Sequence, residues 1–279
     1  MSSRFCFTPQ TLYIFAEYSS NMILEYKNIP IYYNDEGQGK AVVLLHGFLE
    51  TSAMWKDLVA EIGTSHRIIT IDLLGHGKTG CLGYIHTMEM MADAVVFVLE
   101  HLKIEKSFVI GHSMGGYVAL AFAEVFPEKF YGLCLMNSTP FADSLERQIN
   151  RGRAIKVVKQ NHKNFIRMSI SNLLNPEHKE QFVDEIESIM VDAMDLPVQG
   201  IVAALEGMKI RKDRRFVLEQ LEANKMIILG RKDPVLEFDS LSAQLIGLEV
   251  EIVEFPDGHM SHIENKHEFT YIIKRFIEN

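Results

Sequence analysis

The segment Gly111–Gly115 reads Gly-His-Ser-Met-Gly and places a serine between two glycines at the end of an apolar run. Residues 108–110 before it have the length and apolarity of a strand buried on both faces. Residues 117–126 after it are Ala-rich and apolar, without a helix breaker, which predicts a buried helix. A strand that turns this sharply into a helix is typical of an α/β protein with a parallel sheet.

The glycines have a steric explanation. A sharp strand-to-helix turn forces its central residue into a strained conformation, and side chains two positions away on either side would collide. Ser113 would then project its hydroxyl at the carboxyl edge of the sheet, beside a helix N-terminus that favours developing negative charge. The alternative is a serine that only caps the helix. The flanking pattern favours a catalytic nucleophile.

The rest of the chain alternates strands with helices until about residue 137, and the alternation resumes near residue 226. We therefore predict a mostly parallel central sheet with helices on both faces, formed by residues 22–138 and 206–279, with a helical insertion over residues 139–205. The expected strands are residues 23–26, 29–33, 41–45, 67–72, 108–110, 131–136, 226–230 and 250–255, and residues 34–39 are expected to form a turn. The expected core helices are residues 52–62, capped by Ser52, 87–102, 117–126 and 267–277.

Composition restricts the class of protein. The 279 residues include 47% hydrophobic and 23% charged residues, as in an ordinary soluble globular protein. The net charge of −9 argues against nucleic acid as a partner. Cys6, Cys81 and Cys134 suggest no disulfide framework or metal site, and no apolar run suggests a stable membrane anchor, so we expect a cytoplasmic protein. Residues 1–21 lack the features of a signal peptide and are interpreted as a flexible leader or an upstream start.

The predicted insertion has an uneven charge pattern. Seven basic residues from Arg147 to Arg167 occur without an acid among them, and seven acidic residues from Glu177 to Asp195 follow. A basic surface could attract anionic substrates or lipid headgroups. We favour the simpler interpretation, in which the two stretches lie side by side and compensate each other's charge.

Five motifs in order make the chain from Met22 to Asn279 resemble the α/β-hydrolase superfamily, in its serine esterase-like branch with a helical cap. The Gly111–Gly115 segment matches the nucleophile elbow. The other four are His46-Gly47-Phe48 with Trp55, Asp72 to Gly77, Gly230 to Pro234, and Gly258 to Met260. Leu74 stands where the family often has a proline. The resemblance implies the α/β-hydrolase fold and identifies residues 139–205 as the cap.

The resemblance also implies a catalytic triad of Ser113 as nucleophile, His259 as base and Asp233 as orienting acid. An imidazole can take the serine proton and return it to the leaving group, and the carboxylate fixes its tautomer. It further implies an oxyanion hole made by the backbone N–H groups of Phe48 and Met114. The rival acids are Glu237, Asp239 and Asp257, the rival bases are His262 and His267, and Asp72 is expected to brace its own turn. His259, His262 and His267 together are a weak candidate for a metal site.

The sequence thus predicts a serine hydrolase that cleaves a small or medium carboxylic ester through an acyl-enzyme, without cofactor or metal, on a small-molecule substrate. C–C bond, thioester or amide hydrolysis, acyl transfer, and ligand binding on a hydrolase scaffold remain alternatives, and the oligomeric state stays open. Apolar residues of the cap are candidates for the substrate pocket or for packing of the cap onto the core: Phe141, Met168, Leu173, Met190 and Met194.

Overall fold

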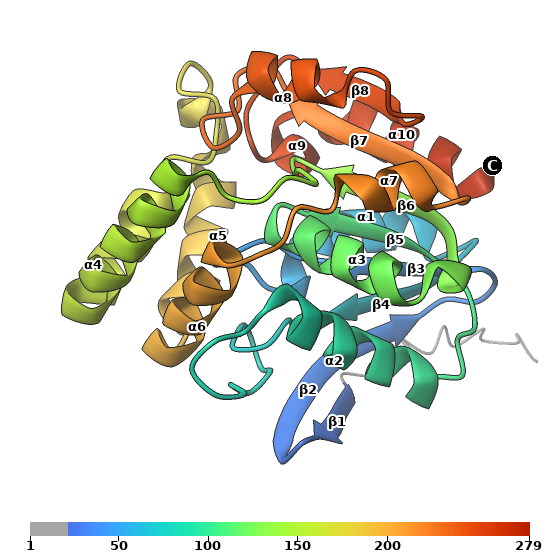
Figure 1. Cartoon of the computed structure of the whole chain (residues 1–279), viewed down its shortest axis with the longest axis horizontal. Helices are drawn as coiled ribbons and strands as arrows, with labels where there is room; N and C mark the ends of the chain where they lie inside the picture. The colour runs from blue at the N-terminus through green and yellow to red at the C-terminus, as the bar shows by residue number, and fades with distance from the viewer. Residues whose placement is uncertain (1–21) are drawn as a thin grey trace, which may run out of the picture.

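A computed structural model describes residues 22–279; the predicted leader and Cys6 lie outside the described residues. Eight strands form one sheet in the order β1-β2-β4-β3-β5-β6-β7-β8 (Figure 1). Neighbours from β4 to β8 are parallel, whereas β2 pairs antiparallel with both β1 and β4. The strands are β1 Met22–Tyr26, β2 Ile29–Glu36, β3 Ala41–Leu45, β4 Arg67–Ile71, β5 Ser107–His112, β6 Phe130–Met136, β7 Asn224–Gly230 and β8 Glu251–Phe255.

Both faces of the sheet are covered by apolar helices. Successive side chains of β3 enter different cores, with Val43 and Leu45 on one face and Val42 and Leu44 on the other. The first core receives side chains from α2 Met88–His101, α3 Met114–Val125 and α7 Arg215–Gln220, and the second from α1 Lys56–Ile62 and α10 Lys266–Glu278. Two short helices, α8 Phe238–Leu245 and α9 Ser261–Glu264, complete the C-terminal part. The predicted α/β fold with helices on both faces is confirmed.

Two local predictions were wrong. Residues 34–36 extend β2 instead of turning, because they pair with β4: Asn34 donates to the Thr70 hydroxyl at 2.9 Å, and Arg67 binds the Asp35 carboxylate. Thr51, not Ser52, caps the turn η1 Ser52–Trp55 that precedes α1. The polar side chains of Asn34 and Asp35, which are typical of a turn, here stabilise the antiparallel pairing of β2 with β4.

Three further helices lie between β6 and β7 and extend to one side of the sheet in Figure 1. They are α4 Leu145–Ile170, α5 Val183–Met194 and α6 Val198–Lys209, with the short turn η3 Lys179–Phe182 before α5. Within residues 22–279 no single helix combines the length and apolarity needed to cross a membrane, although Lys179–Met194 and Val198–Lys209, which meet at 103°, satisfy that test as a bent pair.

The basic and acidic stretches of the inserted helices do not form the ion pairs that charge compensation would suggest. The helices α4 and α5 are in contact. Within the described part of the chain, however, the ion pairs of α4 are made by Arg147 and Arg151, and both go to Asp143 just before the helix. Among residues 22–279, the remaining basic side chains of α4 reach no carboxylate, and Arg153 bonds only to Asn150. Much of the positive charge of α4 is therefore unneutralised by direct contact.

Candidate active site

The turn between β5 and α3 holds Ser113 in a strained left-handed conformation, with φ +47°. Its backbone N–H donates to Met136 O at 2.9 Å and ties the turn to the neighbouring strand. A Cβ atom at Gly111 would lie 2.4 Å from the Gly115 backbone, and one at Gly115 would lie 2.3 Å from Leu45 O. Both glycines are therefore needed for the close approach that brings this serine to the edge of the sheet.

Loops at the ends of β7 and β8 bring Asp233 and His259 together. His259 Nδ1 and Asp233 Oδ2 are 2.7 Å apart, and both side chains are 2% exposed. The other carboxylate oxygen accepts the N–H groups of Val235 and Leu236 at 2.7 and 2.9 Å. Burial opposes ionisation of Asp233, but the imidazole and these donors outweigh it and hold its pKa below the ordinary value. An ionised carboxylate here fixes the imidazole with Nε2 facing away from it.

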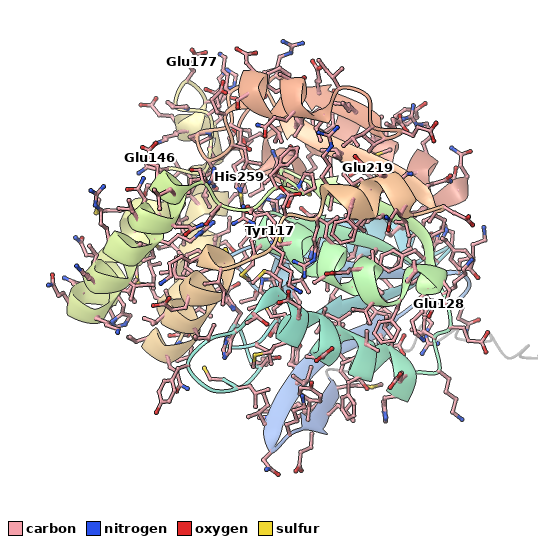
Figure 2. All side chains as sticks on the ribbon, viewed as in Figure 1. Tyr117, Glu128, Glu146, Glu177, Glu219 and His259 are labelled. Atoms are coloured by element: carbon pink, nitrogen blue, oxygen red, sulfur yellow. The ribbon has the colours of Figure 1, made fainter. Side chains whose placement is uncertain are left out.

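Ser113 and His259 line one cavity of about 490 Å³. Figure 2 labels His259 and Tyr117, which both line this cavity beside the inserted helices. No direct hydrogen bond joins the Ser113 hydroxyl to the His259 ring among the described residues, as is common before a substrate tightens the site. The structure thus brings all three predicted triad residues to one place, with the pair Asp233–His259 already hydrogen-bonded.

The predicted oxyanion donors also lie in this region. Phe48 lines the cavity, and Met114 is the first residue of α3, next to Ser113. Neither backbone N–H donates a hydrogen bond within the part of the chain that the structure describes. An unpaired N–H at a helix N-terminus is a ready donor to developing negative charge.

Glu50 and His112 form a buried pair that sequence reasoning missed. Glu50 Oε2 accepts the Gly47 N–H at 2.6 Å and lies 2.8 Å from His112 Nδ1, while His112 Nε2 lies 3.0 Å from the carbonyl oxygen of His259. Burial opposes both charges. The attraction between them nevertheless lowers the pKa of Glu50 to about 2 and raises that of His112.

This pair positions the loop Gly258–Met260, which carries His259 and is called the histidine loop below. A ring that faces a carboxylate on one side and a carbonyl oxygen on the other favours a proton on each nitrogen, so the geometry, like the raised pKa, favours the imidazolium form of His112. It links the loop after β3 to the backbone of His259. His112 therefore bonds outside its own loop, as does His46, whose Nε2 accepts the Leu73 N–H at 2.9 Å. Glu50 is 62 residues away in sequence and follows no recognisable spacing.

The rival acids and bases have other roles. Asp257 binds His178, Asn175 and Asn265, and Glu237 caps α8. Asp72 accepts the N–H groups of Ser52 and Lys78 at 2.8 and 2.9 Å, so it braces its turn as predicted.

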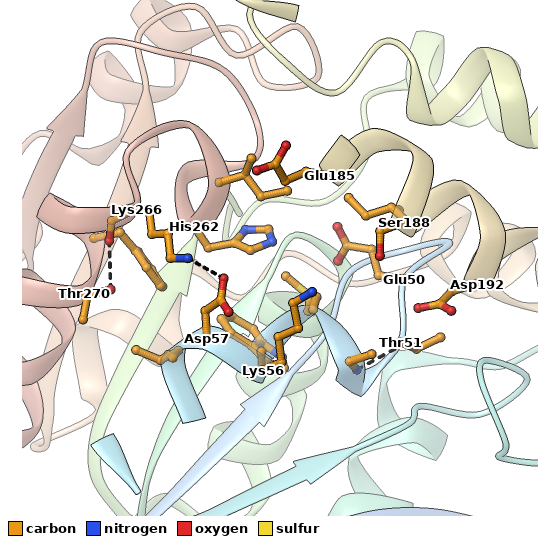
Figure 3. Close-up of a pocket in the computed structure, with 17 residues that line it drawn as sticks. Glu50, Thr51, Lys56, Asp57, Glu185, Ser188, Asp192, His262, Lys266 and Thr270 are labelled. Atoms are coloured by element: carbon orange, nitrogen blue, oxygen red, sulfur yellow. Dashed lines mark hydrogen bonds and ion pairs between the residues drawn. The ribbon is translucent and has the colours of Figure 1, made fainter. Parts of the chain in front are cut away.

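His262 lies beside the buried pair, with its ring centroid 5.7 Å from that of His112. It lines a smaller cavity of about 140 Å³, which Glu50 also borders and whose wall includes the Lys266–Asp57 ion pair (Figure 3). Burial, and next the charge on His112, lower the pKa of His262 to about 3. Among residues 22–279 no three or more His, Cys, Asp or Glu side chains are grouped as ligands for a metal ion.

Of the five predicted pocket residues, Leu173 lines the cavity that contains Ser113 and His259. Its carbonyl oxygen also accepts the His259 N–H at 2.9 Å, which ties the insertion to the histidine loop. Phe141, Met190 and Met194 pack against the core instead, and Met168 is 59% exposed. The apolar lining also includes Phe165, Leu205, Met208 and Val235. The polar lining includes Glu50, His112, Arg147, Asn150, Arg151, Ser169 and Asn172.

Comparison with known proteins identifies the family of the chain. The family model described as alpha/beta hydrolase fold matches residues 40–266, and the chain belongs to this family. The structure of a thermophilic esterase from Thermogutta terrifontis, titled as malate-bound, superposes with a TM-score of 0.86 at 28% identity and covers 93% of this chain and 98% of that one.

Two curated proteins are similar in sequence. The 3-oxoadipate enol-lactonase 1 of Acinetobacter baylyi is 24% identical over 262 residues, which are 91% of this chain and 94% of that protein. The dihydrolipoyllysine-residue acetyltransferase component of the acetoin cleaving system of Pseudomonas putida is 27% identical over 239 residues. That match covers 81% of this chain but only 60% of the Pseudomonas protein. The chain is thus similar to hydrolases over almost its whole length.

Proposed function

We propose that this alpha/beta hydrolase is a serine hydrolase that cleaves a small or medium carboxylic ester through an acyl-enzyme. The observation that carries the proposal is the 2.7 Å contact between buried Asp233 and His259, in a cavity that Ser113 also lines. Relatives named as an enol-lactonase and an esterase favour this bond type over the other bonds that such a triad can cleave.

Each group has a defined task in this reaction. His259 Nε2 takes the proton of the Ser113 hydroxyl as the serine oxygen attacks the ester carbon, and returns it to the departing alcohol. Asp233 keeps the imidazole in the required tautomer and stabilises its cation. The N–H groups of Phe48 and Met114 receive the oxyanion, and each such donor contributes roughly 100- to 1000-fold in rate. A water molecule, deprotonated by His259, then releases the acid and restores the serine.

The experiment is turnover of short p-nitrophenyl esters by the wild type and by Ser113→Ala. A working triad predicts a loss of kcat of about a millionfold. Ser138→Ala is the control and should keep its turnover. It removes a nearby hydroxyl that donates to Ser113 O but does not line the cavity. A ligand receptor on the same scaffold would show no turnover to lose, and that result would refute the proposal.

We further propose that the enzyme is cytoplasmic. Cys81 and Cys134, the cysteines within the described residues, are free thiols, and Cys134 is buried. Unpaired thiols are typical of proteins in reducing compartments.

A further inference from the structure

The cavity that contains Ser113 has a cationic wall on the side of the inserted helices. Arg147 and Arg151, one helical turn apart on α4, both line it. Glu50 is the one carboxylate among the described lining residues, and its charge is matched by His112. The guanidinium groups therefore meet no free negative charge inside the cavity.

The arginines are held in place by a buried carboxylate behind them. Asp143 has a side-chain exposure of 0% and contacts three guanidinium groups: Arg147 Nε at 3.3 Å, Arg151 Nε, and Arg211 Nη1 at 2.5 Å. Arg211 is itself buried and stacks 4.0 Å over the ring of Tyr117, another lining residue. Three positive charges thus share one negative charge, so the cluster keeps an excess of positive charge.

Donors remain available for a ligand. Arg147 uses Nε for Asp143 and Nη1 for the carbonyl oxygen of Val235 at 3.1 Å, and Arg151 uses Nε and Nη2 for Asp143. Within residues 22–279, Arg147 Nη2 and Arg151 Nη1 have no partner. Their side chains are 37% and 15% exposed, so both are partly shielded from solvent. Preorganised guanidinium groups with free donors bind carboxylates well, because the planar fork loses little entropy on binding.

We propose that Arg147 and Arg151 form an anion subsite, and that the substrate is an ester with an ionised carboxylate remote from the bond that is cleaved. This inference rests on the proposed hydrolysis and adds the chemical class of the substrate. A cavity of about 490 Å³ admits such a molecule together with the serine-bound carbonyl group.

The test compares substrates that differ only in charge. In the first pair the varied group is on the acyl side: monomethyl glutarate carries a carboxylate there, and methyl glutaramate carries the neutral amide. The pair 4-acetoxybutanoate and 4-acetoxybutanamide places the same groups on the alcohol side. The readout is the ratio of kcat/KM for acid and amide within each pair, which is independent of the amount of folded enzyme.

The wild type is expected to prefer the carboxylate in at least one pair by about 10- to 100-fold, the range for a hydrogen bond to a charged group. Salt should reduce the preference, because the cluster is partly exposed. Arg147→Gln should bring the ratio towards one while Arg151 and Arg211 still neutralise Asp143. The matched control is Arg153→Gln, which removes the same charge from an exposed position on α4 outside the cavity and should keep the wild-type ratio.

The outcomes separate the two proposals. Ratios near one in both pairs, with measurable hydrolysis, overturn the anion subsite and leave the esterase intact. An equal fall of the ratio in Arg147→Gln and Arg153→Gln also overturns it, since the effect would then come from net charge alone. No hydrolysis of any ester in either pair or of p-nitrophenyl esters overturns the proposed function itself.

Discussion

Replacement of Glu50 by Gln should destabilise the protein strongly, because it leaves the His112 imidazolium buried without its counter-ion. The pKa of Glu50 falls from an ordinary 4.5 to about 2 in the folded state. At about 1.4 kcal/mol per pKa unit, that shift corresponds to roughly 3 kcal/mol of stability at neutral pH. Removal of one partner from a buried ion pair costs a similar amount, about 3–5 kcal/mol.

The pH dependence follows from the direction of the two shifts. A depressed carboxyl pKa stabilises the fold fully above 4.5, and this contribution is lost as the pH falls through about 2. The raised pKa of His112 stabilises the fold fully below 6.5, and this contribution is lost as the pH rises through its folded value. The difference between wild type and Glu50→Gln should therefore be largest between about pH 4.5 and 6.5.

Urea unfolding at pH 5.5 measures this difference. The matched control is Glu61→Gln, which breaks an exposed ion pair with Lys274 and should leave the midpoint unchanged. A loss of stability in Glu50→Gln below about 1 kcal/mol would refute the reasoning, since it would mean that the buried pair carries little net charge.

Two further changes test the site and the packing of the inserted helices. Asp233→Asn should lower kcat by about 10⁴-fold with little effect on KM, because the imidazole loses its required tautomer, and steady-state kinetics on p-nitrophenyl esters will show it. An unchanged kcat would contradict the role of Asp233. Gly207→Ala should lower the thermal midpoint of unfolding. The added methyl group on α6 would lie 1.7 Å from the backbone oxygen of His86, in the segment before α2. Such overpacking costs about 1–3 kcal/mol. Gly152→Ala on α4 meets nothing within 4 Å and should be neutral or stabilising; a shared fall in both variants would contradict the steric explanation.

The fold could be predicted because its signals are local. The central strand Ala41–Leu45 is entirely buried and entirely apolar, and Gly111 is required by the close approach of Gly115, four residues later in the same turn. The errors occurred where a tertiary contact overrides a local pattern. Residues 34–36 look like a turn by composition, yet β4 supplies the partners that make them a strand.

The candidate site could be predicted only in part. Ser113, Asp233 and His259 each stand in a recognisable short motif at the end of a strand, and parallel strands bring such ends together. Glu50 has no motif, and its importance depends on a ring nitrogen 62 residues away. The sequence shows the arginines of α4 only as part of a run of basic residues. Their position at the cavity depends on Asp143, a carboxylate whose burial the sequence does not reveal.

The most direct test of the central claim is labelling of the native enzyme with a fluorophosphonate, followed by mass mapping of the modified residue. The probe reacts with a serine only when a base activates its hydroxyl and donors stabilise the charge that forms. A working triad predicts one label, on Ser113, and in Asp233→Asn this labelling should be abolished or greatly slowed. A label on another residue, or none on enzyme that still hydrolyses esters, would contradict it.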